Sequence, residues 1–149
     1  MMKLGIAILI FAAFLQTTIL PVNLVLLILV LRSFLVNETS NLYLAFGFGL
    51  LISHLNATPL GIQSMVYLSL IIFTRALGRL PISNNILVVI PLTSFASLFD
   101  SAVNAFIMHA SLQIMPVVLP PTILAIPAYI IIRFWEERFV VRDIKLKVK

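Results

Sequence analysis

The chain of 149 residues contains no cysteine and little charge. The absence of cysteine excludes disulfides, thiolate metal sites and lipidated cysteines. Charged residues make up 10% of the sequence, whereas a soluble domain contains roughly 25%, so the chain could not cover a water-facing surface. No nucleophile–base–acid set and no pair of carboxylates suited to hydrolysis can be assembled, so we expect no enzymatic activity.

Patterns that would hold a metal or a nucleotide are also missing. His54 and His109 lack the i, i+4 spacing of a helical metal-binding pair, and no cysteine accompanies them. Hydrogen bonding at the membrane surface is the expected role of both histidines. Gly47 and Gly49 occur in AFGFGLL, but a nucleotide-binding glycine loop needs a preceding strand and a soluble phosphate site. We therefore expect no metal and no cofactor.

Long apolar runs dominate the sequence instead. Hydrophobic residues form 62% of the chain, and the mean hydropathy is +1.18. Residues 1–35, 42–55, 60–77 and 86–108 carry almost no formal charge, and such blocks predict helices in lipid. They show no sustained alternation of apolar and polar residues, which disfavours an outer-membrane barrel. The first run lacks the A-x-A cleavage site of a signal peptide, so we expect it to be retained as a helix.

Polar and proline-rich breaks divide the apolar sequence into six predicted transmembrane helices, because a span needs about 20 mainly apolar residues. The expected helices are residues 4–20, 21–36, 42–56, 60–77, 86–110 and 117–134. The breaks are Pro21 with Asn23, NETSN at 37–41, NATP at 56–59, the stretch 79–85, and the prolines at 116, 120 and 121. We expect one all-α polytopic membrane domain over residues 1–149, with a short basic cytoplasmic tail at 135–149.

The positive charges favour an even number of spans. Lys3 precedes the first predicted helix, and Arg32 lies near the end of the second. Arg75 and Arg79 flank the connection after the fourth, and the other six basic residues lie from Arg133 onward. With both chain ends in the cytoplasm, all ten basic residues fall on the cytoplasmic side, as the positive-inside rule requires. A pI near 10.1 therefore reflects membrane topology, and no nucleic-acid partner is expected.

The basic tail has two possible roles. It can lie on anionic membrane lipids as a topology anchor, or it can dock on a cytoplasmic protein. Its sequence WEERFVVRDIKLKVK mixes basic and acidic residues and is compatible with either role.

Asp100 is the one acidic residue expected inside the membrane, where an ionisable side chain is costly and needs a reason. Ser97, Asp100, Ser101 and Asn104 follow an i, i+3, i+4, i+7 spacing and share one helix face. Ser97, Ser101 and Ala105 also form a stripe of small residues that lets another helix approach closely. Two roles are open: a polar packing seam, or an ion relay or ligand site.

A second set of small residues lies in the predicted third and fourth helices. Ala45 and Gly49 form a small-xxx-small pair, and together with Gly47 they predict a close-packing groove on the third helix. Pro59 and Gly61 are expected to start the fourth helix, through the fixed φ of proline and the conformational freedom of glycine. These positions, like the Asp100 face, are candidates for helix packing or partner contact.

Three segments together resemble the rod shape-determining protein MreD family: QTTILP at 16–21, FGFGLLISHLNATPLG at 46–61, and LPPTILAIPAYIIIRFWEERF at 119–139. The family pattern reads Q-[ST]-T-x-L-P, then G-x-x-x-G-L-x-x-D-x-x-x-x-x-P-L-G, then a proline-bearing last helix with a basic end. Here Ser53 stands where the family has the acid, and the asparagine common in the last helix is absent.

The resemblance implies a non-enzymatic component of the bacterial cell-elongation machinery in the inner membrane. Such a protein would associate with an MreC-type shape protein. Through this partner it would connect to MreB filaments, a SEDS-type glycan polymerase and a class B penicillin-binding protein. Membrane lipids are the other expected contact.

Two other classes of function compete with the scaffold. The MreD-like fold is similar to the S components of energy-coupling-factor transporters, which implies a membrane subunit that binds a small molecule among its helices. Such a site would need several polar and aromatic side chains converging under a lid. An ion channel or proton-coupled transporter would rest on Asp100 alone.

Overall fold

The computed structural model describes residues 2–19, 22–79, 86–111 and 113–146. Within these ranges the chain is all-helical, with six helices and no strand, so the all-α prediction is confirmed. The helices are α1 (Met2–Thr18), α2 (Leu24–Leu35), α3 (Ser40–Leu55), α4 (Ile62–Gly78), α5 (Ile86–Met108) and α6 (Ile114–Leu146). The predicted breaks at Pro21 and at residues 80–85 lie outside the described residues.

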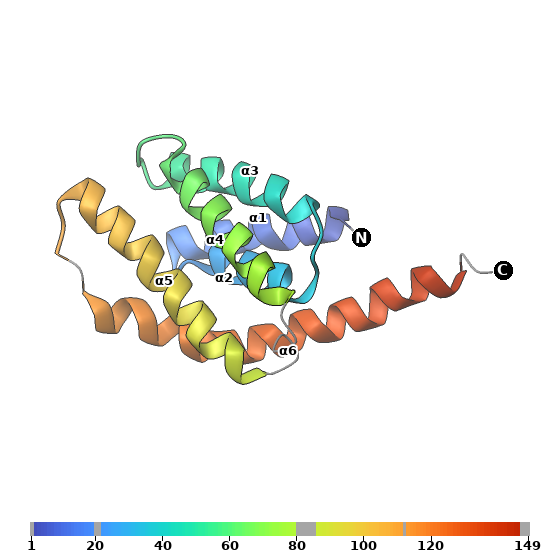
Figure 1. Cartoon of the computed structure of the whole chain (residues 1–149). Helices are drawn as coiled ribbons and strands as arrows, with labels where there is room; N and C mark the ends of the chain where they lie inside the picture. The colour runs from blue at the N-terminus through green and yellow to red at the C-terminus, as the bar shows by residue number, and fades with distance from the viewer. Residues whose placement is uncertain (1, 20–21, 80–85, 112, 147–149) are drawn as a thin grey trace.

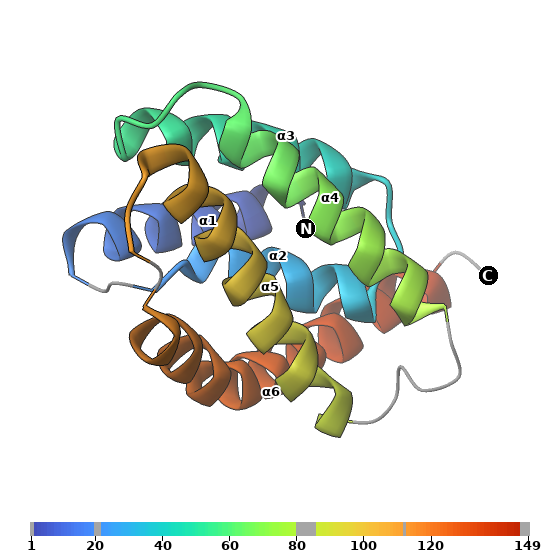
Figure 2. The ribbon, with the colours of Figure 1, turned by 60° about the vertical axis from the view of Figure 1, so that its left-hand side comes forward.

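Helix α2 lies at the centre of the bundle, between the α3–α4 pair and the α5–α6 pair (Figures 1 and 2). Eight of its 12 residues are buried, including Val25, Leu29 and Val30, which have no exposed surface. A helix that is apolar on all sides lies in a protein core or in lipid. Here the neighbouring helices cover most of α2, which is the shortest of the described helices.

Two helix starts follow from single residues. Asn23 precedes α2, and its side-chain Oδ1 accepts a hydrogen bond from the backbone N–H of Leu26 at 3.3 Å. Gly61 precedes α4 with φ of +96°, a conformation that favours glycine. Pro59 lies in the turn before Gly61, not in the first turn of the helix, so the prediction that proline starts α4 is wrong.

The last helix is longer than predicted. It continues through Pro120, Pro121 and Pro127, and residues 135–146 of the predicted tail belong to it. Proline has a helix-compatible φ, and lost backbone hydrogen bonds can be replaced by hydroxyls and neighbouring groups.

Contacts between side chains stabilise the charged part of α6, which follows its apolar part. Arg133 Nε donates to Glu137 Oε1 at 2.8 Å, and the guanidinium of Arg138 lies 5.2 Å from the ring centre of Phe134. Both are i, i+4 pairs, which stabilise an exposed helix. The polar segment therefore stays helical instead of forming a separate tail.

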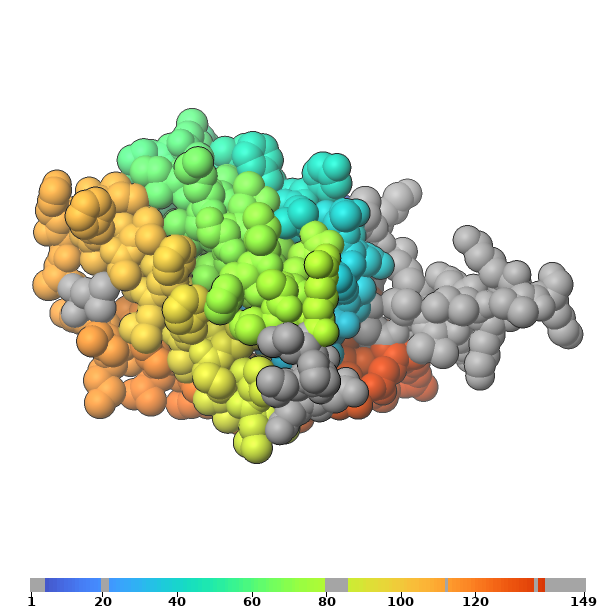
Figure 3. Space-filling view, in the orientation of Figure 1, coloured from blue at the N-terminus to red at the C-terminus, as the bar shows by residue number. Residues whose placement is uncertain are grey.

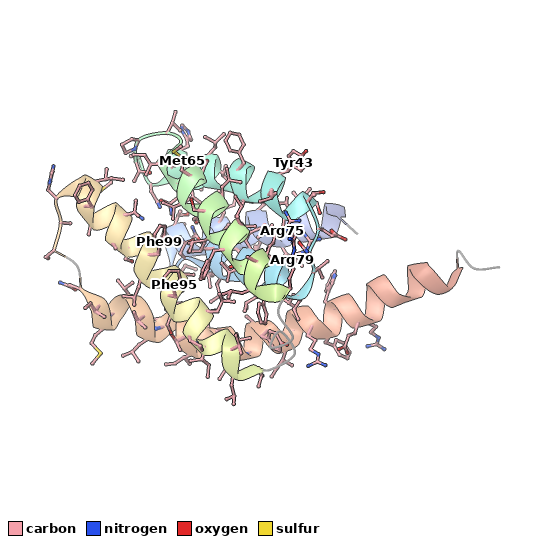
Figure 4. The ribbon with its side chains drawn as sticks, viewed as in Figure 1. Tyr43, Met65, Arg75, Arg79, Phe95 and Phe99 are labelled. Carbon is pink, nitrogen blue, oxygen red and sulfur yellow. The ribbon has the colours of Figure 1, made fainter. Side chains whose placement is uncertain are left out.

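The connections of the bundle gather at two ends. The α1–α2, α3–α4 and α5–α6 connections lie on the left of Figure 1, and the start of α1 and the end of α6 lie on the right. Arg75 and Arg79 lie at the right-hand end of α4 (Figure 4). Arg75 Nε donates to Asn37 Oδ1 in the α2–α3 connection at 2.6 Å. The end that holds the chain termini is thus also a basic end.

Two described helical segments are long and apolar enough to cross a membrane, Ile86–Met108 and Ile114–Trp135. Only 28% and 17% of these segments are buried, whereas the core helix of a soluble protein is mostly buried. Figure 3 shows the face on which α4 and α5 lie side by side. Apolar side chains such as Met65, Ile72 and Phe95 are exposed on these two helices, which supports a lipid environment.

Candidate functional site

Asp100 is buried at the end of the bundle opposite the chain termini. It is the last of the buried residues along α5, after Val89, Leu92 and Ala96. Its exposed fraction is 8%, although it is the acid of a helix that is apolar enough to cross a membrane. The carboxylate therefore depends on partners from the protein.

Three side-chain amides supply those partners. Asn23 Nδ2 donates to Asp100 Oδ2 at 3.0 Å, and Gln63 Nε2 on α4 donates to Oδ1. Asn104 Nδ2, one turn further along α5, donates to Oδ1 at 3.3 Å. The carboxylate thus joins the start of α2, the first turn of α4 and the middle of α5.

The orientation of two of these amides follows from their other contacts. Asn23 Oδ1 accepts from the N–H of Leu26, which can only donate, and from the hydroxyl of Tyr67 at 2.6 Å. Asn104 Nδ2 donates to the backbone carbonyl of Asp100 at 2.9 Å, which can only accept. Both NH₂ groups must therefore face the carboxylate, which is the arrangement an ionised carboxylate accepts.

A cavity of about 460 Å³ lies beside this cluster. Seven of its nine lining residues are polar, and Asp100 is the only charged one. The lining residues are Gln16, Val22, Asn23, Asn56, Thr58, Gln63, Asp100, Asn104 and Met108. They come from four parts of the chain: the end of α1, the turn into α2, the α3–α4 region and α5. We call this the polar cavity.

The predicted polar face of α5 divides into two parts. Asp100 and Asn104 line the polar cavity, whereas Ser97 and Ser101 are half-buried. Ser101 and Ala105 line a second cavity of about 300 Å³, together with residues of the α5–α6 connection and the start of α6. Asn104 and Met108 line both cavities. Ser101 and Ala105 thus border open space near the start of α6, and the close approach predicted for the stripe stays a prediction.

Sequence reasoning placed Asn104 on the same helix face as Asp100 but missed its partners from other parts of the chain. It treated Asn23 as a turn residue and gave no role to Gln63, or to Tyr67, which bonds Asn23. The available signal was the occurrence of Gln or Asn near the same end of three separate apolar helices. Gln63 and Tyr67 also follow an i, i+4 spacing that places both on one face of α4.

Gly49 lies in a close contact between α3 and α4. A Cβ atom at this position would lie 2.7 Å from the backbone N of Ser64 and 2.8 Å from its Oγ, too close for a real side chain. Ala45, one turn earlier, has no exposed surface, as the small-xxx-small spacing predicts. Gly47 is exposed with open space around it, so its predicted place in the groove is wrong. Two residues from Gly49 on a helix, it faces the opposite side.

Ser53, at the position of the family's acid, has no exposed surface. Its Oγ has no hydrogen-bond partner among the described residues, while its carbonyl accepts from Thr58 Oγ1 at 3.3 Å. Thr58 in turn lines the polar cavity, so Ser53 lies next to the cavity wall.

Comparison with protein-family models, curated proteins and solved structures finds no match for this chain. Function is therefore argued from the geometry above and from the three sequence segments that resemble the MreD family.

The contact at Gly49 predicts opposite effects of alanine at two neighbouring glycines. Gly49→Ala should lower stability by roughly 1–3 kcal/mol, because the new methyl group would push the backbone of α4 away. Gly47→Ala, the matched control on the same helix, should be neutral or slightly stabilising because alanine favours helices. Thermal unfolding of the purified protein in detergent measures both. Equal melting temperatures for the two variants would contradict the close contact.

Proposed function

We propose that this chain is a non-enzymatic scaffold of the bacterial cell-elongation machinery. One observation carries the proposal: two segments that resemble the MreD family meet at one place in the fold. Gln16 from QTTILP and Asn56 and Thr58 from the segment ending in PLG line the same cavity, although about 40 residues separate them in sequence. Motifs that share a structural site are less readily explained by chance similarity between apolar sequences.

The packing supports a scaffold because it favours a fixed shape. Gly49 brings α3 and α4 into backbone contact, and Asp100 joins the start of α2 to α4 and α5. A scaffold must hold its partners in a constant geometry, and such contacts resist the movement of one helix against another. Its proposed direct partner is an MreC-type shape protein, with MreB filaments and the peptidoglycan synthases as indirect partners.

The proposed topology is six spans with both ends in the cytoplasm of the inner membrane. The basic end of the bundle, with Arg75 and Arg79, would then face anionic lipid on the cytoplasmic side. The polar cavity at the other end would face the periplasm.

A substrate-binding membrane subunit is the second candidate. The polar cavity favours it, because about 300–1,000 Å³ is the usual volume of a small-molecule site and several polar side chains converge there. Scaffolding alone gives no reason for such a space.

The topology can be tested in this cysteine-free chain with single cysteines at exposed positions. Cysteines at Ala57 and Gln113 should react with an impermeant thiol reagent in whole cells, whereas cysteines at Thr39 and Glu137 should react only after permeabilisation. Labelling of Glu137→Cys in intact cells, together with Ala57→Cys, would contradict an even number of spans.

The function can be tested by depleting the protein in the bacterium that encodes it. Cells should widen or round up, and the tagged protein should co-purify with the MreC-type partner. Wild type and Gly47→Ala should restore rod shape, whereas Gly49→Ala should restore it less well because it disturbs the α3–α4 contact. Normal shape after depletion, with loss of uptake of a small nutrient, would replace the scaffold by the substrate-binding subunit.

A further inference from the structure

We propose that the polar cavity binds the ammonium group of a small hydrophilic amine, with Asp100 as its counter-charge. This site goes beyond the scaffold function, which needs no ligand. The shared chemistry is a primary ammonium beside a hydroxyl or ether oxygen. It occurs on free amino alcohols and on ethanolamine lipid headgroups.

The carboxylate of Asp100 has no cationic partner among the described side chains. The ion pairs found among the described side chains, Arg32–Glu38 and Arg133–Glu137, do not include Asp100. The partners described for its carboxylate oxygens are neutral amides. A buried carboxylate with only neutral partners is costly to ionise, and a bound cation would supply the positive charge that compensates it.

The carboxylate of Asp100 can accept more hydrogen bonds than the described side chains donate to it. Its two oxygens offer about four acceptor positions, and three N–H donors use three of them. One position therefore remains for a donor in the cavity. An ammonium group would add a charge-assisted hydrogen bond, which is stronger than one from a neutral donor.

The size and lining of the cavity define the rest of the ligand. Its volume of about 460 Å³ is many times the volume of a water molecule or a bare ion. Asn56 and Thr58, which also line the cavity, are neutral and can bond hydroxyl or ether oxygens, while Val22 and Met108 can contact methylene groups. None of the described lining residues is basic, so an anionic group inside the cavity would have no cationic partner among them.

A metal ion fits the same groups less well. Hard cations such as Ca²⁺ need six or more oxygen ligands, whereas both oxygens of Asp100 already face N–H donors. The amide oxygen of Asn23 is occupied by Leu26 and Tyr67. No group of three or more His, Asp or Glu side chains suited to a metal occurs in the part of the chain that the structure describes.

The test uses the purified full chain in phosphatidylcholine nanodiscs, with ethanolamine hydrochloride as the probe. Ethanolamine should raise the melting temperature, whereas equal concentrations of sodium chloride or of the uncharged analogue ethylene glycol should not. Nanodiscs that also contain phosphatidylethanolamine show whether a lipid headgroup is the source, because that lipid alone should then raise the melting temperature. If neither amine source stabilises the protein beyond the salt and glycol controls, the proposal is wrong.

Variants locate the site. Asp100→Asn should weaken ethanolamine binding about tenfold or more, because the charge-assisted hydrogen bond is lost. Thr58→Val changes a lining residue that makes no described hydrogen bond to Asp100, and it should weaken binding less. This variant keeps the test decisive if Asp100→Asn does not fold. Ser101→Ala, in the second cavity, is the matched control and should bind like wild type. Unchanged binding by both Asp100→Asn and Thr58→Val would place the amine elsewhere and overturn the proposal.

Discussion

One buried carboxylate organises the end of the bundle opposite the chain termini. Asp100 accepts hydrogen bonds from Asn23, Gln63 and Asn104, and Asn23 also accepts from Tyr67. Each of these polar groups lies in an apolar helix bundle, where an unpaired donor or acceptor costs about 1–3 kcal/mol. The groups satisfy one another only in this arrangement, so the cluster fixes how α2, α4 and α5 meet.

The remaining packing is largely apolar and divides the molecule into two different ends. The central helix α2 is buried on most sides, and the glycine contact at Gly49 lets α3 and α4 touch through their backbones. One end carries arginines that pair with groups in the α2–α3 connection, Arg75 with Asn37 and Arg32 with Glu38. The other end holds neutral amides around one acid. The two ends of the bundle therefore differ in their chemistry.

The apolar blocks predicted the six helices because composition and the distance between breaks determine a helix locally. The same reasoning ended α6 too early, since it treated prolines and charges as stops. The helix instead continues through three prolines, and the Arg133–Glu137 pair stabilises its charged part. The same reasoning could not foresee the Asp100 cluster. Asn23 and Gln63 lie 77 and 37 residues from Asp100, and periodicity identifies a helix face without showing which helix lies opposite.

The coupling between Asn23 and Asp100 tests the central claim most directly. Asn23→Ala, Asp100→Ala and the double variant would be unfolded in detergent with a chemical denaturant, and the free energies compared in a double-mutant cycle. The hydrogen bond at 3.0 Å between the half-buried Asn23 and the buried Asp100 predicts a coupling energy of at least about 1 kcal/mol. A cycle of Asp100→Ala with Ser69→Ala, an exposed site on α4, should be additive within about 0.5 kcal/mol. Additivity for Asn23 and Asp100 as well would contradict the account, because the two side chains would then act independently.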